Sequence, residues 1–187
     1  MRLLPKSNAI LKGTQISGAI FSPCRKYRYA LWRQWDAGRP DCAFIGLNPS
    51  TADENVLDPT LRRCKGYAQD WGYGGIVMLN LFAYRATDPK DMKAQLDPVG
   101  PENDDYIWAI TDAIHMVVCA WGAHGSYQQR DESVIVTIQA DMHALVLTKD
   151  GHPRHPLYLK KDLRPRKWYV RDRLLGSDLF DKYGGAA

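Results

Sequence analysis

Four short apolar runs are spaced along the chain, and segments with apolar residues at helical spacing separate them. The runs predict buried strands at residues 44–47, 76–81, 116–120 and 144–148. Because successive residues in each run are apolar, both faces of the resulting sheet must be covered, as in a mainly parallel sheet. The pattern therefore predicts an α/β fold with three layers, in which a central, mainly parallel sheet lies between helices.

The segments that connect these runs carry helix signals. Asp58 and Pro59 are typical of the N-cap and the first position of a helix, and Gly72 is typical of its end. Further helices are predicted within residues 104–114 and 126–140, the first of them with acidic residues at its start, which favours a helix N-terminus. Strands that alternate with helices in this way are typical of parallel connections.

The two ends of the chain differ from this alternating centre. Residues 15–35 hold two runs around the turn-like sequence SPCRK, the second of them rich in aromatic residues, which predicts a β-hairpin. Residues 160–175 are predicted to form a basic helix. No repeat or low-complexity linker interrupts the sequence, so residues 1–187 are expected to form a single domain.

Composition excludes several classes of protein. The 187 residues are 45% hydrophobic and 25% charged, as in globular proteins. No apolar run approaches the roughly 20 residues that span a bilayer, and no export signal is evident, so we expect a cytoplasmic protein that does not bind membranes. No nucleotide-cofactor motif is present. The cysteines are far apart, which predicts reduced thiols and no metal site: Cys24, Cys42, Cys64 and Cys119.

The net charge of +4 is unevenly distributed. Lysine and arginine dominate residues 160–173, and Trp168 and Tyr169 lie among them. Cations in such a segment can follow a phosphate backbone, and aromatic rings between them can stack on bases. A solvated basic helix is the alternative explanation of the same composition.

Polar residues stand at or near the ends of the predicted strands. Asn48 follows the first strand, Asn80 lies in the second, the sequence WGAHG follows the third, and His152 and His155 follow the fourth. In open parallel sheets, ligands bind beyond the carboxyl ends of the strands. The sequence therefore predicts a site at this edge of the sheet.

The order of these motifs resembles that of the uracil-DNA glycosylase superfamily. The sequence GLNPS at residues 46–50 is similar to its first motif, most closely in the mismatch-specific branch. Residues 75–89 resemble the strand with the base-reading asparagine, 117–125 the strand that precedes the last unit, and HPLYL at 155–159 the final motif. The sequence also resembles an uncharacterised bacterial and phage family that shares these motifs. The hairpin is not part of the superfamily resemblance.

The resemblance implies a role for each matching residue. His155 would stabilise negative charge on the departing base, and Asn80 would read the edge of a flipped pyrimidine. Asn48 would position the attacking water, and Gly46 and Ser50 would border the base. Leu159 falls where the superfamily has a wedge that enters the helix, and four basic residues beside it would bind phosphates: Lys160, Lys161, Arg164 and Arg166.

Two departures from the superfamily pattern bear on substrate and rate. Ser50 stands where strict uracil enzymes have a tyrosine that excludes groups at carbon 5, so the pocket is expected to accept a carbon-5-modified pyrimidine. Asn48 stands where the efficient enzymes have an aspartate, which implies slower chemistry unless Asp53 or Asp58 reaches the water. The side chain of Asn80 suits uracil in one orientation and cytosine in the other.

The predicted function is therefore a monomeric DNA glycosylase without a cofactor, acting on double- or single-stranded DNA. Modified cytosines of phage DNA would be its substrates in antiviral defence; uracil repair and a catalytically idle DNA-binding protein are the alternatives. His152 is an alternative to His155, and His124 is expected to be structural. Arginines that could contact phosphate and aromatic residues that could stack on a base complete the candidates: Arg62, Arg63, Arg85, Tyr67, Trp71 and Tyr73.

Overall fold

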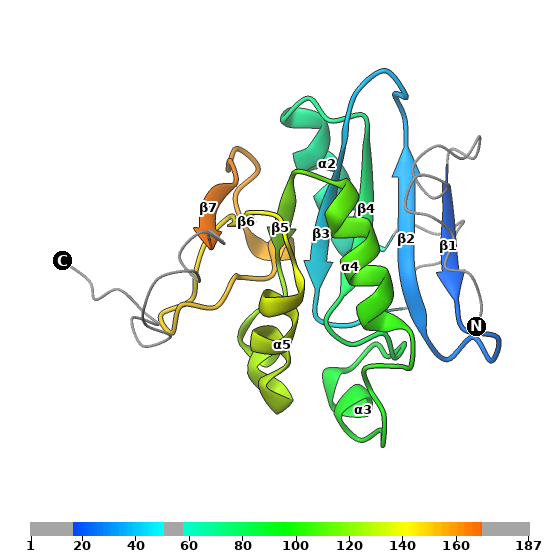
Figure 1. Ribbon diagram of the computed structural model, residues 1–187. Coiled ribbons are helices and arrows are strands. Elements are labelled where there is room, and N and C mark those ends of the chain that lie inside the picture. Colours follow the sequence, from blue (N-terminus) through cyan, green and yellow to red (C-terminus); the bar gives the residue numbers. More distant parts are fainter. Residues whose placement is uncertain (1–16, 51–57, 170–187) are drawn as a thin grey trace.

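The computed structural model describes residues 17–50 and 58–169, and its centre is one mixed sheet of seven strands. The strands lie in the order β1-β2-β4-β3-β5-β6-β7 (Figure 1). The four central strands β4, β3, β5 and β6 are parallel, and the outer pairs are antiparallel. Their bounds are Ser17–Phe21, Arg28–Gln34, Asp41–Gly46, Gly75–Asn80, Val117–Cys119, Met142–Ala144 and Arg166–Tyr169, from β1 to β7.

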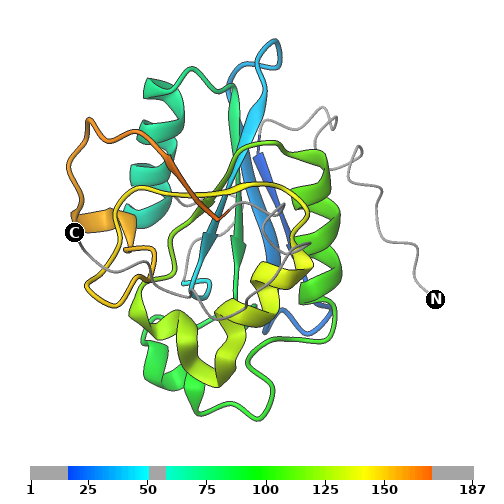
Figure 2. The same cartoon turned by 60° about the vertical axis from the view of Figure 1, so that its left-hand side comes forward.

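Helices cover both faces of the sheet, so the molecule has three layers. Helix α2 lies on one face, and α4 and α5 lie on the other (Figure 2). The α-helices α2 to α5 span Pro59–Asp70, Pro89–Lys93, Asn103–Ala113 and Arg130–Thr137, and the 3-10 helices η1 and η2 span Ala123–Gln129 and Pro156–Tyr158. No helix in the described ranges is long and apolar enough to cross a membrane.

Helix α2 begins and ends where local sequence signals place it. The Asp58 carboxylate accepts a hydrogen bond from the N–H of Leu61 at 2.7 Å, and Pro59 occupies the first turn. The chain leaves the helix through Gly72, whose φ of 88° is in the region that glycine adopts without strain. The predicted start and end of this helix are therefore confirmed.

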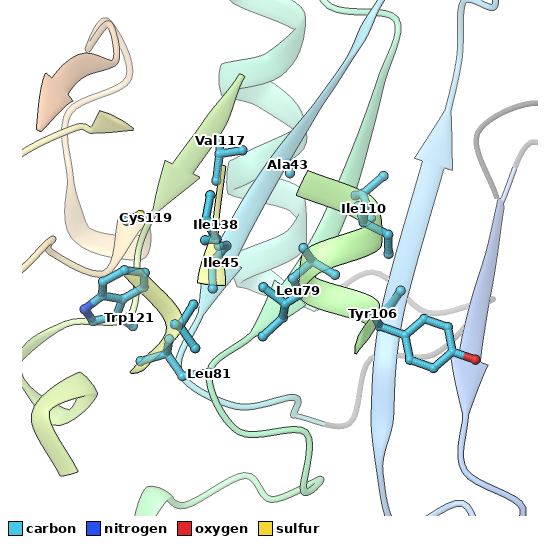
Figure 3. Packing of buried hydrophobic residues seen from close by; sticks show 14 of the residues in the cluster. Ala43, Ile45, Leu79, Leu81, Tyr106, Ile110, Val117, Cys119, Trp121 and Ile138 are labelled. Carbon is cyan, nitrogen blue, oxygen red and sulfur yellow. The ribbon is translucent and has the colours of Figure 1, made fainter. Parts of the chain in front are cut away.

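Two apolar clusters hold the layers together. The cluster under α4 and α5 includes Ile45 and Leu79 (Figure 3), and the cluster under α2 includes Phe44 and Met78. Successive strand residues point to opposite faces, so even-numbered positions of β3 and β4 face α2. By this alternation Asn80, the last residue of β4, lies on the α2 side of the sheet.

The α/β fold with a mainly parallel centre is confirmed, and the four predicted strands are neighbours. The fourth was predicted at residues 144–148, whereas β6 ends at Ala144. The reason is a competing local pairing: Arg154 donates its N–H to the carbonyl of Val146 at 2.8 Å, and Leu147 forms a bridge with Pro153. Residues 146–148 therefore pair with the loop that follows them rather than with the sheet.

The prediction of a basic helix at residues 160–175 is wrong for the part that the structure describes. Residues 166–169 form β7, which pairs antiparallel with β6 at the edge of the sheet. Trp168 and Tyr169 are aromatic residues that favour strands, and Pro165 is unfavourable inside a helix. Residues 170–175 lie outside the described ranges. The predicted hairpin is confirmed over residues 17–34, where β1 and β2 pair.

A buried asparagine fixes the start of α4 against the end of β4. Asn103 is fully buried, and its side-chain amide donates to the carbonyls of Asn80 and Leu81, each at 3.0 Å. Arg130 donates to the carbonyl of Leu81 as well, at 2.8 Å. These bonds satisfy backbone groups at the point where the strand leaves the sheet.

We expect Asn103→Ala to lower the free energy of unfolding by about 1–3 kcal/mol, because it leaves a buried carbonyl without its donor. Urea denaturation followed by circular dichroism measures the change. Asp112→Ala, an exposed substitution on the same helix, is the control and should have little effect. Equal stability of the two variants would contradict a stabilising role for the hydrogen bonds of Asn103.

Candidate functional site

The topology places a switch point at the carboxyl ends of the parallel strands. Strand β3 lies between β4 and β5, and the helix that follows β3 covers one face of the sheet while the helix that follows β5 covers the other (Figure 2). Chain segments therefore leave β3 and β5 toward opposite faces. Open α/β sheets bind ligands at such a point.

Asn80 is a deeply buried polar side chain at this edge. Its side chain is almost completely buried, with 3% of the residue exposed. In the parallel register it lies beside Gly46, where an added Cβ would come within 3.1 Å of the Asn80 Oδ1. The Nδ2 of Asn80 has no hydrogen-bond partner within residues 17–50 and 58–169. A buried donor without a partner is a candidate contact for a ligand.

Asn48 is held by two backbone carbonyls. Its Nδ2 donates to the carbonyl of Ala86 at 2.7 Å and to that of Pro49 at 3.2 Å. The N–H of Ala86 in turn donates to the carbonyl of Pro49 at 2.9 Å. Since the amide nitrogen faces two acceptors, the orientation of the side chain is fixed and its Oδ1 remains as an acceptor.

Ser50 is joined to the start of α2 by a side-chain hydrogen bond. Its hydroxyl donates to Oδ2 of Asp58 at 2.6 Å, while Oδ1 of the same carboxylate caps α2 through the N–H of Leu61. Both oxygens of Asp58 therefore accept hydrogen bonds already. Asp53, the other acidic candidate, lies outside the described residues.

His155 stands at the start of η2, in an exposed position. Its Nδ1 accepts a hydrogen bond from the N–H of Leu157 at 3.4 Å, which assigns the ring proton of the neutral form to Nε2. Partial desolvation lowers the pKa of His155, and the negative charge of Asp58 opposes this shift to a lesser extent. These surroundings therefore favour the neutral ring, whose proton is on Nε2.

The structure separates the two histidines that the sequence leaves as alternatives. His152 lies beside the helix on the other face of the sheet, where its Nδ1 is 3.5 Å from a carboxylate oxygen of Asp131 in α5. Between the two histidines, the carbonyl of Pro153 accepts a hydrogen bond from Gly122 at 2.7 Å. His155 therefore lies with η2, which contacts α2, whereas His152 lies against α5.

Leu159 does not fit the wedge role that the resemblance implies. Only 8% of this residue is exposed, and it packs in the apolar cluster under α2. The preceding residue, Tyr158, is 85% exposed. The turn of η2 directs Leu159 inward and Tyr158 outward, an arrangement that the spacing from His155 does not reveal.

One row of side chains on α2 fixes the segment that follows η2. Arg63, Tyr67 and Trp71 are spaced four residues apart and so share one side of the helix. Arg63 donates to the carbonyl of Leu159, Tyr67 donates to that of Lys160, and Trp71 donates to that of Leu163 at 2.9 Å. These three residues therefore have structural contacts.

The basic residues predicted to bind phosphate lie on this anchored segment. All four are exposed: Lys160, Lys161, Arg164 and Arg166. Asp162, also exposed, is the acidic residue among them. The segment thus presents positive charge on a backbone that α2 holds in place.

The remaining candidates lie in other surroundings. His124 is exposed, and its Nδ1 is 3.3 Å from the ammonium of Lys93. Arg62 is exposed on α2, whereas Arg85 donates to the carbonyl of Arg25 at 3.2 Å. Tyr73 packs against the cluster under α2. Within the described ranges, no group of three or more potential metal-ligating residues of the types His, Cys, Asp and Glu occurs.

Comparison with known proteins gives one family. The model of the family described as "Protein of unknown function (DUF1643)" matches residues 28–157, and the chain belongs to this family. The matched region begins with β2 and ends within η2, so it includes Asn48, Asn80 and His155. No curated protein and no solved structure matches the chain.

We expect the pKa of His155 to lie below the ordinary value of about 6.5, because desolvation disfavours the charged ring. Asp58→Asn should lower it further, because the opposing negative charge is removed. A folded-state pKa below the unfolded value means that this residue's contribution to stability is complete above about pH 6.5 and declines as the pH falls. Two-dimensional NMR of the histidine rings during a pH titration measures the value.

Asp70→Asn, at the opposite end of α2, is the matched control for the loss of a carboxylate and should leave the pKa of His155 unchanged. A pKa at or above the ordinary histidine value in the unsubstituted protein would contradict the described surroundings of the ring.

Proposed function

We propose that the protein is a DNA glycosylase that hydrolyses the N-glycosidic bond of a flipped pyrimidine and leaves an abasic site. The observation that carries this proposal is Asn80, a buried amide at a strand end whose nitrogen has no partner in the described structure. An unpaired buried donor costs about 1–3 kcal/mol. A base that enters the site and accepts this hydrogen bond recovers that cost on binding.

An amide suits the edge of a pyrimidine. Asn80 offers a donor and an acceptor side by side, and positions 3 and 4 of a pyrimidine present the complementary pair. Gly46 contributes by leaving the space beside the Asn80 Oδ1 free of a side chain. Because a base inside a duplex cannot reach such a buried group, the nucleotide must leave the stack first.

His155 would stabilise the departing base. When the C1′–N bond breaks, its electron pair leaves with the base, and negative charge develops on the 2-oxo group. In the neutral ring the proton is on Nε2, because Nδ1 accepts from Leu157. A hydrogen bond from a neutral donor avoids the cost of holding a cation in a desolvated site.

Asn48 would hold the attacking water through its Oδ1. The water oxygen bonds to C1′, one proton of the water ends on the released base, and the other stays on the new hydroxyl. A neutral amide orients the water without accepting its proton. The carboxylate of Asp58 is occupied by Ser50 and Leu61, which supports the expectation of slow chemistry that depends on the leaving group.

DNA would be held by the exposed cations that follow η2. Their backbone is fixed by α2, so their side chains are the mobile part of the contact. Since Leu159 is buried, Tyr158 is the side chain that could fill the space left by a flipped nucleotide. Its ring can stack on a neighbouring base.

The substrate we propose is a pyrimidine with a substituent at carbon 5, such as the hydroxymethylated or glucosylated cytosine of phage DNA. Ser50 is a small residue at the position where the superfamily resemblance implies a filter. An enzyme of this kind in antiviral defence would leave abasic sites in modified DNA and spare unmodified DNA. Excision of uracil in repair is the alternative, and a comparison of modified and uracil-containing DNA distinguishes the two substrates.

His155→Ala and Asn80→Ala should each reduce base release by about a hundredfold to a thousandfold, because each removes a donor to the base. The measurement is strand cleavage by alkali after incubation with DNA that carries the modified base. His152→Ala is the matched control, since it removes a histidine of the same loop that contacts Asp131 instead.

If His155→Ala keeps full activity while its fold is intact, the role given to this histidine is wrong. If the unsubstituted protein releases no base from any tested DNA, the glycosylase activity is excluded, and the alternative of a catalytically idle DNA-binding protein is favoured.

The carbon-5 hypothesis predicts a specific effect at position 50. Ser50→Tyr should suppress release of glucosylated cytosine more than release of uracil, because only the bulky group needs the space. Ser50→Ala serves as the control, because it also removes the hydrogen bond to Asp58 but adds no bulk. Abasic-site counts on phage DNA, uracil-containing DNA and ordinary DNA measure the preference; activity on uracil DNA alone would exclude the modified-base substrate.

A further inference from the structure

The turn of the β1–β2 hairpin lies at the same edge of the sheet as Asn80. Strand β2 runs antiparallel to β4, so the start of β2 lies beside the end of β4. The N–H of Arg28, the first residue of β2, donates to the carbonyl of Ala83 at 2.9 Å. Residues 22–27 therefore flank the carboxyl ends of the parallel strands (Figure 1).

Hydrogen bonds within this turn hold it in one conformation. Ser22 accepts from the N–H of Arg25 at 2.8 Å through its carbonyl and from the N–H of Tyr27 at 3.2 Å through its hydroxyl. Arg25 has a φ of 55°, in the left-handed region that few residues other than glycine adopt. The ordered turn presents two exposed cations, Arg25 and Lys26.

A third cation, Arg85, shares the aromatic ring of Phe21 with Arg25. The guanidinium carbons of Arg25 and Arg85 lie 4.1 Å and 4.9 Å from the centroid of the Phe21 ring. Each cation is attracted to the ring, but the two positive charges repel each other. A bound anion offsets that repulsion, and the planar guanidinium matches the oxygens of a phosphate group.

The same turn is joined by backbone hydrogen bonds to the candidate site. Arg85 donates its N–H to the carbonyl of Lys26 at 3.0 Å. The next residue, Ala86, accepts the side-chain hydrogen bond of Asn48 at 2.7 Å. Two consecutive residues of the chain thus connect the basic turn to the side chain that would hold the water.

We propose that Arg25, Lys26 and Arg85 form a second phosphate-binding site for the DNA strand that enters the candidate site. The hairpin turn lies beside the carboxyl end of β4, whereas the basic segment that leads to β7 runs along α2 from Arg63 toward Trp71. A DNA strand held by the turn would therefore pass the carboxyl ends of the parallel strands, where the flipped base would enter. The inference rests on the proposed function for the identity of the ligand as DNA.

The test is the binding of a short DNA duplex, followed by fluorescence anisotropy between about 50 and 200 mM salt. Arg25→Asn and Lys26→Ala should each weaken binding about fivefold near 0.15 M salt, and each should lower the slope of log K against log salt by about 0.9. Asparagine is chosen because it tolerates the left-handed backbone at position 25. Arg39→Ala is the matched control: this exposed arginine follows the other end of β2 and pairs with Asp36 at 3.0 Å.

Unchanged affinity and salt slope in both turn variants would overturn the inference. Lys160→Ala, measured in parallel, shows whether a failure of the second phosphate site is also a failure of the DNA binding that the proposed function requires. If Lys160→Ala weakens binding and the turn variants do not, only the second phosphate site is wrong. If none of the three variants changes binding, DNA is not held as the proposed function requires. Weaker binding by the turn variants supports the phosphate site even where no base is released.

Discussion

The register between β3 and β4 is the constraint on which the candidate site depends. It sets Gly46 beside Asn80, and any side chain at position 46 would press on the Asn80 Oδ1. The backbone at the end of β4 is satisfied separately, because Asn103 donates to its carbonyls from the opposite layer. The side chain of Asn80 is consequently buried beside Gly46, and its nitrogen has no partner among the described residues.

Helix α2 organises what lies around that amide. Its N-cap, Asp58, accepts a hydrogen bond from Ser50, and the negative charge of Asp58 opposes the lowering of the pKa of His155. Farther along, a single row of side chains bonds to the backbone after η2 and fixes the basic segment. The helix therefore determines the position of both the polar residues at its start and the basic segment along its length.

Features governed by neighbouring residues could be predicted from the sequence, and features governed by distant ones could not. The start of α2 follows from Asp58 and Pro59, and the central strands follow from uninterrupted apolar runs. The short β6 and the strand β7 depend on pairings with other segments, which a single sequence does not reveal. Leu159 was given the wrong role because its spacing from His155 is preserved, whereas the direction of its side chain is set by packing against α2.

The carboxylate of Asp58 also links the stability of a helix to the proposed specificity. One oxygen stabilises the first turn of α2, and the other accepts a hydrogen bond from Ser50, the residue that we propose borders the base. A mutation at position 50 that alters which molecules the protein accepts therefore also removes a partner from a helix cap. Lineages that change specificity at this position must restore that partner or tolerate a less stable helix, so drift there is restricted by folding as well as by function.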